Sequence, residues 1–364
     1  MWSQRKIRNT QLYQIFNPQH HLYQIVDSDS RAKELVAEYN VSGIPTPPPL
    51  YDGSKRQFTE SIRDNEKHRL AKQIRDYSSQ ELEKDYTKLC EIGCDASNQS
   101  VYVTTGNKVV DQFTFAERLN TISRNRLSFY EFWENINYFK NKPNIKKLLT
   151  EMETTRKSET EYTRLYNVYR LYYGAVNIFR PVLAMEYYCL YQPKTILDFT
   201  MGWGGRLVGA CALNIPKYIG IDSNTRLESA YTGLKTFLAP RTQTQIQLHF
   251  KSALEMDYSK LDYDMVFTSP PYYNTEKYQH TIVYNDKQYW DELFYRPLFY
   301  QTYKHLKKGG VYCLNISVEI YTRVCMSLLG EATTMFPMKK NNRHNKQGAK
   351  TDHLNTEYIY VWKK

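Results

Sequence analysis

Residues 264–273 of the 364-residue chain read DMVFTSPPYY, an apolar run that two consecutive prolines end. The β-branched and aromatic residues predict a buried strand, and neither proline can donate a hydrogen bond to a neighbouring strand. We therefore expect the strand to stop at Ser269. Pro271 keeps Pro270 out of the helical region, so the Pro270 carbonyl and the Ser269 hydroxyl have fixed directions. Two acceptors beside the Tyr272 ring suit a planar group that carries an NH₂.

Ser-Pro-Pro-Tyr can also be an ordinary turn that closes a strand, since Ser and Pro are common turn formers. The surrounding sequence favours a site, because strands and helices alternate from about residue 195. Strands are predicted over 195–199, 217–222, 245–251, 311–316 and 357–362, besides the one that ends at Ser269, and helices over about 205–213, 224–238, 290–306 and 319–329. This alternation predicts an α/β fold with a doubly wound, mostly parallel sheet, whose ligands lie beyond the carboxyl ends of the strands.

The first predicted strand runs into Asp198-Phe199-Thr200-Met201-Gly202-Trp203-Gly204-Gly205. Glycines at such a turn let the backbone approach a ligand, and the following helix offers free N–H groups to an anion. The spacing is not that of a dinucleotide fingerprint, because Leu207 stands where Gly or Ala is required. Asp222 ends the second predicted strand and could accept hydrogen bonds from both hydroxyls of a ribose. Alternatively, Asp198 caps the helix and Asp222 begins a turn.

Together, the Gly-rich turn, the acidic end of the second strand and Ser-Pro-Pro-Tyr resemble the S-adenosylmethionine-dependent methyltransferases that modify exocyclic amino groups of DNA bases. The resemblance covers about residues 179–364. The first motif of this family is usually Asp-Pro-Phe-x-Gly-x-Gly; Asp198, Gly202 and Gly204 match it, and Phe-Thr replaces the Pro-Phe pair. The resemblance implies a Rossmann-like methyltransferase fold with an antiparallel last strand, and S-adenosylmethionine as the cofactor.

The resemblance also implies roles for individual residues. The turn from Asp198 to Gly204 would hold the methionine portion of the cofactor and Asp222 its ribose, while Phe179 belongs to an additional cofactor motif. Ser252 and Ala253, after the third strand, would lie along the adenine. The implied cofactor-binding residues are Phe179, Asp198, Thr200, Gly202, Gly204, Asp222, Ser252 and Ala253, and the implied catalytic residues are Ser269, Pro270, Pro271 and Tyr272.

The chemistry follows from the weak nucleophilicity of an exocyclic amino group, whose lone pair is delocalised into the ring. Ser269 and the Pro270 carbonyl can orient the NH₂ for attack, so catalysis is mainly positioning and electrostatics. A base in a duplex would leave the stack and lie against Tyr272. Family members with Ser at the first position are more often cytosine-N4 enzymes, whereas Asp or Asn is more often found in adenine-N6 enzymes. Ser269, preceded by Thr268, therefore favours cytosine.

The N-terminal part, residues 1–160, is predicted to be mainly helical, and residues 161–364 to form the methyltransferase domain. Helices are predicted over about 31–39, 60–91 with a capping box at Ser78 and Glu81, 115–123, 128–140 and 143–152, and as a pair over 162–191 that Arg180-Pro181 interrupts. A loop is predicted over 42–49 and a hairpin over 101–113. LYQI recurs at residues 12 and 22, either as two paired strands or by coincidence. Aromatic residues over 128–140 predict a helix that contributes to the core.

Target recognition has no room between the two motifs, which are separated by about seventy residues. It is expected from residues 1–160, from the loop 273–289, or from the basic stretch 339–346, which can also be a solvated surface loop. Glu276 and Tyr278 are second-rank candidates to line the base pocket.

The composition limits the setting of the protein. The net charge of +11 indicates a polyanionic partner, with DNA expected and RNA possible. The six cysteines lack C-x-x-C spacing and are expected to be reduced, buried thiols, without a disulfide framework or a metal site: Cys90, Cys94, Cys189, Cys211, Cys313 and Cys325. Neither a signal peptide nor a membrane-spanning run is evident, so a soluble intracellular protein is expected.

Two alternative functions remain at the level of sequence. The same site could methylate RNA or a protein amide, since a flat NH₂ group is all that Ser-Pro-Pro-Tyr requires. The fold could also serve as a non-catalytic nucleic-acid-binding subunit. A binding subunit has no use for an acid that holds a ribose, so intact Asp222 favours an enzyme.

Overall fold

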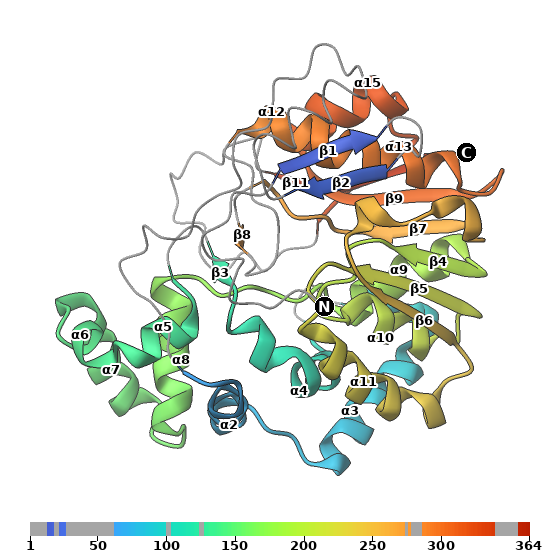
Figure 1. Ribbon diagram of the computed structural model, residues 1–364. Coiled ribbons are helices and arrows are strands. Elements are labelled where there is room, and N and C mark those ends of the chain that lie inside the picture. The colour runs from blue at the N-terminus through green and yellow to red at the C-terminus, as the bar shows by residue number, and fades with distance from the viewer. Residues whose placement is uncertain are drawn as a thin grey trace.

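A seven-stranded sheet organises the chain in the computed structural model (Figure 1). The structure describes residues 13–17, 22–26, 62–99, 103–123, 127–273, 276–277, 286–338 and 356–364. The helix predicted over 31–39, the loop 42–49, Tyr278 and the basic stretch 339–346 lie outside these ranges, as does most of the loop 273–289.

The sheet has the strand order β10-β11-β9-β7-β4-β5-β6. Its strands are β4 (Thr195–Asp198), β5 (Lys217–Asp222), β6 (Gln245–Phe250), β7 (Met265–Thr268), β9 (Val311–Ser317), β10 (Thr334–Pro337) and β11 (Glu357–Lys363). Neighbouring strands from β6 to β9 are parallel, and β11 is antiparallel to both β9 and β10. The predicted Rossmann-like fold, a doubly wound and mostly parallel sheet with an antiparallel last strand, is confirmed. β10 was not predicted.

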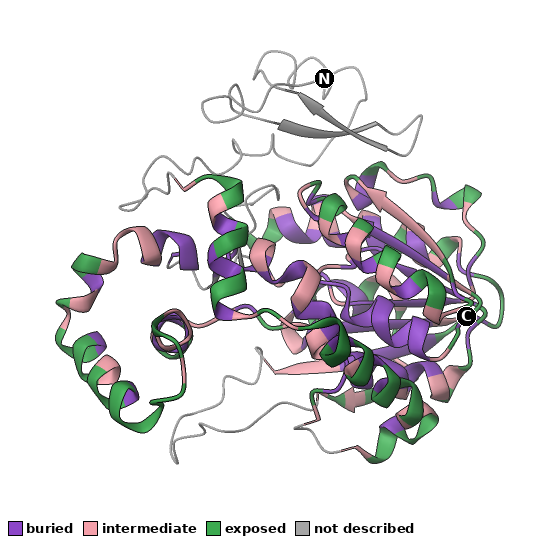
Figure 2. Cartoon of the chain, turned by 90° about the horizontal axis from the view of Figure 1, so that it is seen from below, coloured by how far each residue is buried: buried purple, intermediate pink, exposed green. Residues whose placement is uncertain are grey.

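Burial explains why the central strands form. All four residues of β4 and of β7 are buried, as expected for a parallel sheet that is covered on both faces. β7 ends at Thr268, directly before Ser269 and the two prolines, which is the predicted stop. Figure 2 shows the buried strands at the centre and exposed residues on the outer sides of the helices.

Helices cover both faces of the sheet. One apolar cluster joins the sheet to α3 (Ser79–Ile92), α4 (Asn107–Arg118), α9 (Pro181–Tyr191), α10 (Gly205–Ala212) and α11 (Leu227–Leu238). A second cluster joins the other face to α12 (Lys287–Trp290), α13 (Arg296–Lys304), α14 (Val318–Ile320) and α15 (Met326–Leu329), and to two π-helical turns, Asp291–Tyr295 and Tyr321–Cys325. The predicted helices 290–306 and 319–329 are thus each interrupted by a π-helical turn.

A third apolar cluster forms the helical region beside the sheet. Its helices are α2 (Asp64–Ile74), α5 (Phe129–Glu134), α6 (Ile136–Lys140), α7 (Pro143–Thr155) and α8 (Glu161–Tyr172), together with the C-terminal part of α4, whose Phe115 lies in this cluster. The capping box at Ser78 and Glu81 is confirmed at the start of α3. The clusters cross residue 160, because α3 and α4 pack on the sheet while α8 packs with α2.

The hairpin predicted over 101–113 is wrong. Residues from Asn107 form α4, in which buried Val110, Thr114 and Arg118 recur every four residues. The alternation in the sequence gave no information on the packing of this segment against α3 and α11, which selects a helix. The helix predicted over 115–123 ends at Arg118 instead, and Ile122–Ser123 form strand β3.

The helix predicted over 128–140 is divided into α5 and α6 at Asn135. Its aromatic residues lie in the core at Phe129, Tyr130 and Phe132, each with an exposed fraction of 0%. The side chain of Tyr138 does not, because 50% of it is exposed.

Two short antiparallel pairs lie outside the main sheet. β1 (Tyr13–Asn17) pairs with β2 (Leu22–Val26), so the two LYQI copies lie in paired strands, except for Leu12, which is outside the described residues. β3 pairs with β8 (Glu276–Lys277) and so joins the helical region to the segment that follows Ser-Pro-Pro-Tyr. Two of the three regions expected to recognise the target therefore meet in one pair of strands.

The expectation of reduced, buried cysteines is wrong for three of them. Cys94 and Cys189 form a disulfide with their Cα atoms 5.4 Å apart, and Cys90 is exposed. The partners are 95 residues apart in the sequence, and only the packing of α9 on the turn Gly93–Asn98 brings them together. The remaining thiols are buried. None of the helices in the described ranges has both the length and the apolar character that a membrane span requires.

Candidate active site at the carboxyl edge of the sheet

The predicted site residues lie where β4, β5 and β7 end. β4 ends at Asp198, β5 at Asp222 and β7 immediately before Ser269. β4 lies between the other two, and the carboxyl ends of adjacent parallel strands meet at one edge of a sheet. The structure therefore brings the Gly-rich turn, Asp222 and Ser-Pro-Pro-Tyr to the same edge.

Asp198 is fully buried and saturated with hydrogen bonds from within the protein. Arg206 donates to it from Nε at 2.6 Å and from a terminal nitrogen at 3.0 Å, Tyr218 from its hydroxyl at 2.6 Å and Thr268 at 2.8 Å. Burial raises the pKa of Tyr218 well above its ordinary value, so this phenol remains a donor at neutral pH. The Asp198 carboxylate thus stabilises the Gly-rich turn through buried hydrogen bonds.

Thr200 links the Gly-rich turn to the end of β7. Its backbone N–H donates to Thr268 Oγ1 at 3.2 Å, and the two hydroxyl oxygens are 2.6 Å apart. Because Thr268 donates its own proton to Asp198, Thr200 is the donor in this contact. Arg206 also donates to the Thr200 carbonyl at 2.6 Å. In this arrangement Thr200 positions the turn with its side chain turned inward.

The Gly-rich turn depends on two glycines for different reasons. Gly202 has φ of 55°, in the left-handed region that favours glycine, and its N–H donates to Asp222 Oδ2 at 2.9 Å. At Gly205, an added Cβ would lie 1.7 Å from the Phe179 carbonyl oxygen. The backbone at Phe179 therefore lies directly against the start of α10, and Gly204 is the N-cap residue that precedes this helix.

The Phe179 ring is half-buried between the turn and β7. It packs edge-on against Phe267, with ring centroids 5.4 Å apart, and the Arg206 guanidinium lies 5.2 Å from its centroid. Phe267 directly precedes Thr268. The ring therefore lies beside the strand end that carries Ser-Pro-Pro-Tyr.

Asp222 is a half-buried acid with two backbone donors. Oδ2 accepts from Gly202 and Oδ1 accepts from the N–H of Asn224, each at 2.9 Å. Burial raises its pKa to about 6, against the lowering effect of these two hydrogen bonds. Each carboxylate oxygen retains a lone pair for a further donor, so above pH 6 the group can accept from two hydroxyls.

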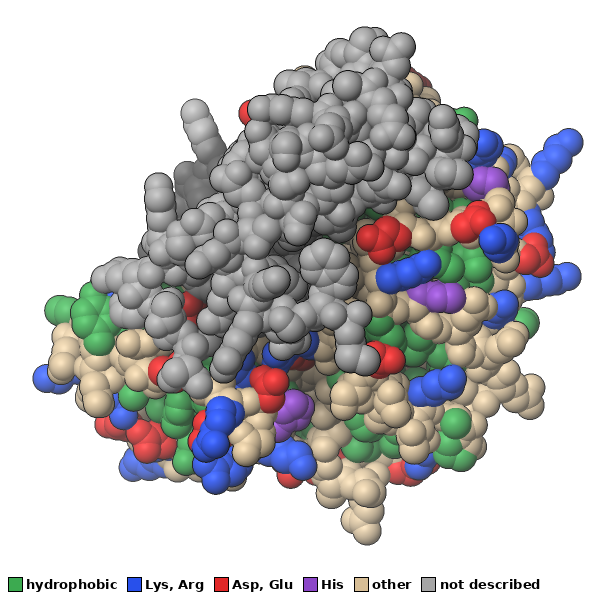
Figure 3. Space-filling view, in the orientation of Figure 1, with side chains coloured by type: hydrophobic (Ala, Val, Ile, Leu, Met, Phe, Trp, Pro, Cys, Tyr) green, Lys and Arg blue, Asp and Glu red, His purple; other side chains and the backbone are tan. Residues whose placement is uncertain are grey.

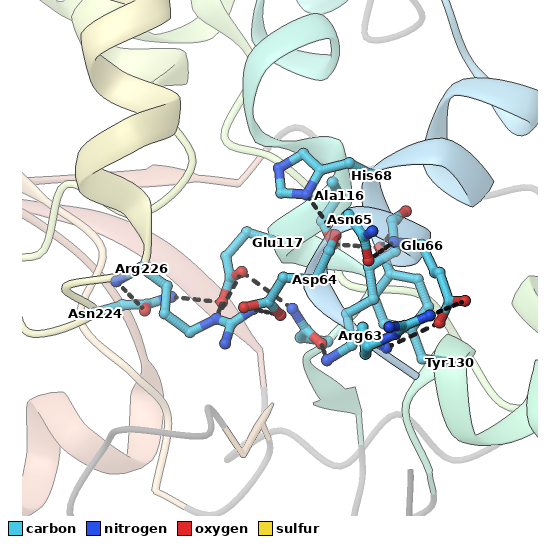
Figure 4. Close-up of polar contacts among 12 residues, drawn as sticks. Arg63, Asp64, Asn65, Glu66, His68, Ala116, Glu117, Tyr130, Asn224 and Arg226 are labelled. Carbon is cyan, nitrogen blue, oxygen red and sulfur yellow. Dashed lines mark hydrogen bonds and ion pairs between the residues drawn. The ribbon is translucent and has the colours of Figure 1, made fainter. Parts of the chain in front are cut away.

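The loop after Asp222 is held by the helical region, as Figure 4 shows. Glu117 of α4 accepts from Arg226 Nε at 3.1 Å and from Asn224 Nδ2 at 3.4 Å. Arg226 also pairs with Asp64 at the start of α2, at 2.6 Å. Glu117 and Asp64 thus fix the loop whose backbone donates to Asp222.

Ser252 and Ala253 follow β6, whose Phe250 is in register with Asp222. The Ser252 hydroxyl accepts from the N–H of Leu254 at 3.3 Å, and Ala253 is buried with an exposed fraction of 7%. They lie at the same edge of the sheet as Asp222, one strand further out.

In the Ser-Pro-Pro-Tyr turn, Ser269 Oγ lies 3.1 Å from the Tyr272 hydroxyl. The Tyr272 hydroxyl donates its proton to the Asn315 carbonyl at 2.9 Å and accepts from Asn315 Nδ2. A phenol has one proton, so Ser269 must be the donor in its contact with Tyr272. The lone pairs of Ser269 Oγ are therefore left to accept, which is the role that capture of an NH₂ requires.

Three buried side chains and one partly exposed arginine fix the backbone of this turn. Tyr295 donates to the Pro271 carbonyl at 2.6 Å and accepts from the N–H of Tyr273 at 3.0 Å. Tyr273 has φ of 47° and donates to Asp291 at 2.9 Å, and Asp291 pairs with Arg323 at 2.6 Å. Asp291 and Arg323 belong to the two π-helical turns, a feature frequent at functional sites.

Sequence reasoning missed the residues that hold the site: Arg206, Asn315, Tyr295 and Glu117. A signal existed for Asn315, because a polar residue interrupts the apolar run VYCLNIS at the carboxyl end of a predicted strand. Arg206 stood in the first turn of a helix, where a positive charge is unfavourable unless an acid is paired with it. Nothing in the sequence distinguished Tyr295 or Glu117 from other residues of their type.

The described part of the surface is mixed in charge. On the face shown in Figure 3, the Lys and Arg side chains outside the grey region are interspersed with Asp, Glu and apolar side chains, without a continuous basic stripe. The net charge of +11 is therefore not gathered on the described portion of this face.

Comparison with known proteins gives structural likenesses only. No family model matches the chain, and no curated protein matches it. An rRNA methylase from Streptococcus thermophilus is 14% identical, with 52% of this chain and 99% of that chain covered and a TM-score of 0.34. An S-adenosylmethionine-dependent methyltransferase from Clostridium acetobutylicum is 11% identical, with 56% and 99% covered and a TM-score of 0.34. TrmN from Thermus thermophilus is 17% identical, with 50% and 48% covered and a TM-score of 0.32.

Proposed function

We propose that the chain is an S-adenosylmethionine-dependent methyltransferase that modifies an exocyclic amino group of a DNA base, with cytosine N4 favoured over adenine N6. The observation that carries the proposal is the hydrogen bonding of the Ser269 hydroxyl. This hydroxyl donates to Tyr272, so its lone pairs are held as acceptors at the strand end. No hydrogen bond to the Pro270 carbonyl occurs among the described residues, which supports it as a second acceptor.

The residues at the other half of the edge fit the cofactor. Asp222 has a remaining lone pair on each oxygen for the ribose hydroxyls, and the left-handed Gly202 lets the backbone turn closely around a ligand. Ser252 and Ala253 follow the strand paired with that of Asp222, where an adenine joined to the ribose would extend. Asp198 and Thr200 support the turn by their inward hydrogen bonds.

The reaction needs little from the protein besides positioning. When bound, S-adenosylmethionine supplies an electrophilic methyl group on a sulfonium centre. Ser269 Oγ and the Pro270 carbonyl would each accept a hydrogen bond from one N–H of the target amino group. These two bonds orient the amino group so that its nitrogen lone pair is less delocalised into the base ring and points toward the methyl group. The same acceptors stabilise the N–H groups as positive charge develops on nitrogen. The Tyr272 ring offers a face on which an extruded base can stack.

The base and the polymer are expectations from chemistry and family resemblance. Ser269, with Thr268 before it, favours cytosine, whereas Asp or Asn at the first position is more frequent in adenine enzymes. The net charge of +11 suits a polyanion. RNA carries the same backbone charge and some of the same amino groups, so it forms a separate arm of the test.

The test is transfer of a labelled methyl group from S-adenosylmethionine to mixed-sequence duplex DNA, single-stranded DNA and RNA, followed by nucleoside digestion and mass spectrometry. We expect N4-methylcytosine or N6-methyladenine from DNA. Ser269→Ala should lower kcat by about 10²-fold, since it removes one of two orienting acceptors. Its dissociation constant for S-adenosylmethionine should be unchanged. Ser259→Ala is the matched control, because Ser259 is exposed and bonds to Asp257.

The outcomes separate the alternatives. A methylated base found in RNA alone would replace the DNA proposal with an RNA one. Unchanged turnover by Ser269→Ala would show that another group accepts from the amine. Cofactor binding without transfer to any nucleic acid would direct the search to protein amides, and absence of cofactor binding would favour a non-catalytic binding subunit.

A further inference from the structure

Asn315 is a polar residue inside the apolar strand β9, at its carboxyl end. β9 is parallel to β7, and its Leu314 is in register with Thr268, so Asn315 lies beside the start of Ser-Pro-Pro-Tyr. Its exposed fraction is 1%. No role in cofactor or base binding was expected of it, and the Gly-rich turn and Asp222 do not bond to it.

Outside the sheet, the backbone carbonyl and the side chain of Asn315 bond to one atom among the described residues, the Tyr272 hydroxyl oxygen. The Asn315 carbonyl accepts the Tyr272 proton at 2.9 Å, and Nδ2 donates to the same oxygen. The first bond determines the orientation of the amide, because a hydroxyl that has given its proton away can only accept from the side chain. Nδ2 must then face Tyr272.

This leaves Asn315 Oδ1 buried and without a hydrogen-bond partner. Buried polar atoms are nearly always paired, and an exception calls for an explanation. A purely structural residue at this strand position would be better served by an apolar side chain such as Leu. The half-satisfied amide is explained if its contact with Tyr272 serves the site.

We infer that Asn315 is a positioning residue that sets the pose of the Tyr272 ring against the target base, an inference that rests on the proposed function. The ring can serve as a stacking surface only if it is held at a fixed place relative to Ser269, the acceptor of the amino group. The backbone carbonyl and Nδ2 of Asn315 both bond to the hydroxyl oxygen of Tyr272, which lies 3.1 Å from Ser269 Oγ. Asn315 therefore fixes the hydroxyl end of the ring.

Asn315 acts on Ser269 through the same hydroxyl. By taking the Tyr272 proton on its carbonyl, it leaves the Tyr272 oxygen as the acceptor for Ser269, which directs the Ser269 proton away from the target. The Nδ2 bond secures that direction. Loss of the side chain leaves the backbone carbonyl in place but removes the Nδ2 bond that keeps the Tyr272 oxygen oriented as an acceptor. The Tyr272 hydroxyl would then share its proton between the Asn315 backbone carbonyl and Ser269, which weakens Ser269 as an acceptor of the amine.

The experiment is a double-mutant cycle on the full chain with Asn315→Leu, Tyr272→Phe and the double variant, measured as kcat, KM for duplex DNA and the dissociation constant for S-adenosylmethionine. Asn315→Leu should lower kcat about tenfold without a change in cofactor affinity, which is about 1.4 kcal/mol of interaction with the transition state. Since Asn315 acts through the Tyr272 hydroxyl, the double variant should be no slower than Tyr272→Phe alone. Cys313→Ser, two residues earlier on the same strand and fully buried, is the control for disturbance of β9; it should lower Tm and leave kcat unchanged.

Each other outcome overturns the inference in a distinguishable way. Additive losses in the double variant, or an unchanged kcat in Asn315→Leu, would remove the role of Asn315 while wild-type transfer still supports the proposed function. If Cys313→Ser lowered kcat as much as Asn315→Leu at a similar loss of Tm, the loss of kcat in Asn315→Leu would be due to destabilisation of β9. Absence of transfer by the wild type to any nucleic acid would remove the proposed function and this inference with it.

Discussion

The two halves of the carboxyl edge are held by different kinds of interaction. We call the part of the edge formed by the Gly-rich turn and Asp222 the cofactor half, and the part formed by Ser-Pro-Pro-Tyr the substrate half. The structure of the cofactor half is held by a buried ion pair between Asp198 and Arg206, whose side chains are 0% and 4% exposed. The substrate half depends mainly on neutral hydroxyl groups, with Tyr295 bonded to both sides of the turn that contains Tyr273. Its ion pair, Asp291 with Arg323, is partly solvated, since the Arg323 side chain is 40% exposed.

This difference matches the demands on each half. The cofactor half would hold the same ligand in every cycle, and a buried ion pair with further hydrogen bonds keeps a loop in one arrangement because separating the charges is costly. Under the proposed function, the substrate half would admit a base and release it. A hydrogen bond from a neutral hydroxyl contributes less to stability than a buried ion pair does. Several such bonds can break and re-form as a base enters and leaves, without leaving a buried charge unpaired.

Breaking the charged half should have the largest effect. Arg206→Ala leaves the Asp198 carboxylate buried without its counter-ion, which we expect to cost about 3–5 kcal/mol of unfolding free energy. For a chain of 364 residues the fall in Tm is then about 4–7 °C. Thermal and denaturant unfolding measure it.

An exposed ion pair provides the contrast. Lys140 and Glu161 pair at 2.9 Å with side chains that are 40% and 65% exposed, so Lys140→Ala should cost less than about 1 kcal/mol. Removing both charges, in Asp198→Asn with Arg206→Met, should cost less than Arg206→Ala. If Arg206→Ala were as stable as Lys140→Ala, the distinction between the two halves would fail.

Breaking the neutral half should have a smaller effect on stability. Tyr295→Phe leaves the Pro271 carbonyl and the Tyr273 N–H without their shared partner, at a cost of about 1–3 kcal/mol. Because the turn loosens, kcat should fall while the dissociation constant for S-adenosylmethionine stays constant. Tyr263→Phe is the matched control, since this buried hydroxyl donates to the Thr302 carbonyl away from the turn. It should lower Tm to a similar extent and leave kcat unchanged; an equal loss of kcat in both variants would contradict the prediction.

The sequence was sufficient to predict every strand of the sheet except β10, and the turns at its carboxyl edge. Apolar runs such as residues 195–199 and 264–268 predicted strands, and the prolines and glycines that follow them predicted turns at one edge, because both signals are local. The hairpin predicted for residues 101–113 failed because contacts between α4 and distant helices decided the local structure.

The supporting residues could not be predicted because their partners are distant in the sequence. Tyr272 and Asn315 are 43 residues apart, and Glu117 and Arg226 are 109 apart. The disulfide of Cys94 and Cys189 has the same origin. A motif can be identified from its spacing because its residues lie together on one loop. The residues that support the motif come from distant parts of the chain, and only the packing of the fold brings them into contact with it.

Neutralising Asp222 should affect stability and binding in opposite directions. Its pKa of about 6 lies above the value of 3.8 for a free side chain, so between pH 4 and 6 the folded state retains a proton that the unfolded state has lost. Stability therefore falls with rising pH across this interval and stays lower above it, by on the order of 2–3 kcal/mol from this group. Asp222→Asn should lack this loss, so its advantage in Tm over the wild type should grow from pH 4 to 6 and then level off.

The same variant should bind S-adenosylmethionine about tenfold more weakly at pH 8, because an amide provides only one oxygen for two ribose hydroxyls. Wild-type affinity should decrease below pH 6, as the carboxylate takes up a proton, and the affinity of the variant should not. Calorimetric titration at pH 5 and pH 8 measures both. A wild-type affinity that is independent of pH over this range would exclude Asp222 as the ribose acceptor.

The smallest effect is expected where the helical region supports the cofactor half. Glu117→Gln removes the charge that pairs with Arg226 and weakens the hold on Asn224, whose backbone donates to Asp222. Arg226 keeps Asp64, and partly exposed pairs are worth at most about 1 kcal/mol, so the dissociation constant for S-adenosylmethionine should rise by no more than about fivefold. Tm should change little. Glu83→Gln, which removes a comparable pair with Arg241, should leave cofactor binding unchanged.

This small effect tests whether the helical region contributes to cofactor binding or only adjoins it. Glu117 contacts the loop and not the ligand side of Asp222, so any change in affinity must pass through Asn224. If Glu117→Gln and Glu83→Gln bind the cofactor equally well, the helical region serves the substrate half alone, where β3 pairs with β8 after Ser-Pro-Pro-Tyr. If only Glu117→Gln is weakened, the same helices support both halves of the edge. Under the proposed function, any effect of the cofactor on DNA affinity should then be matched by an equal effect of DNA on cofactor affinity, and Glu117→Gln should reduce both.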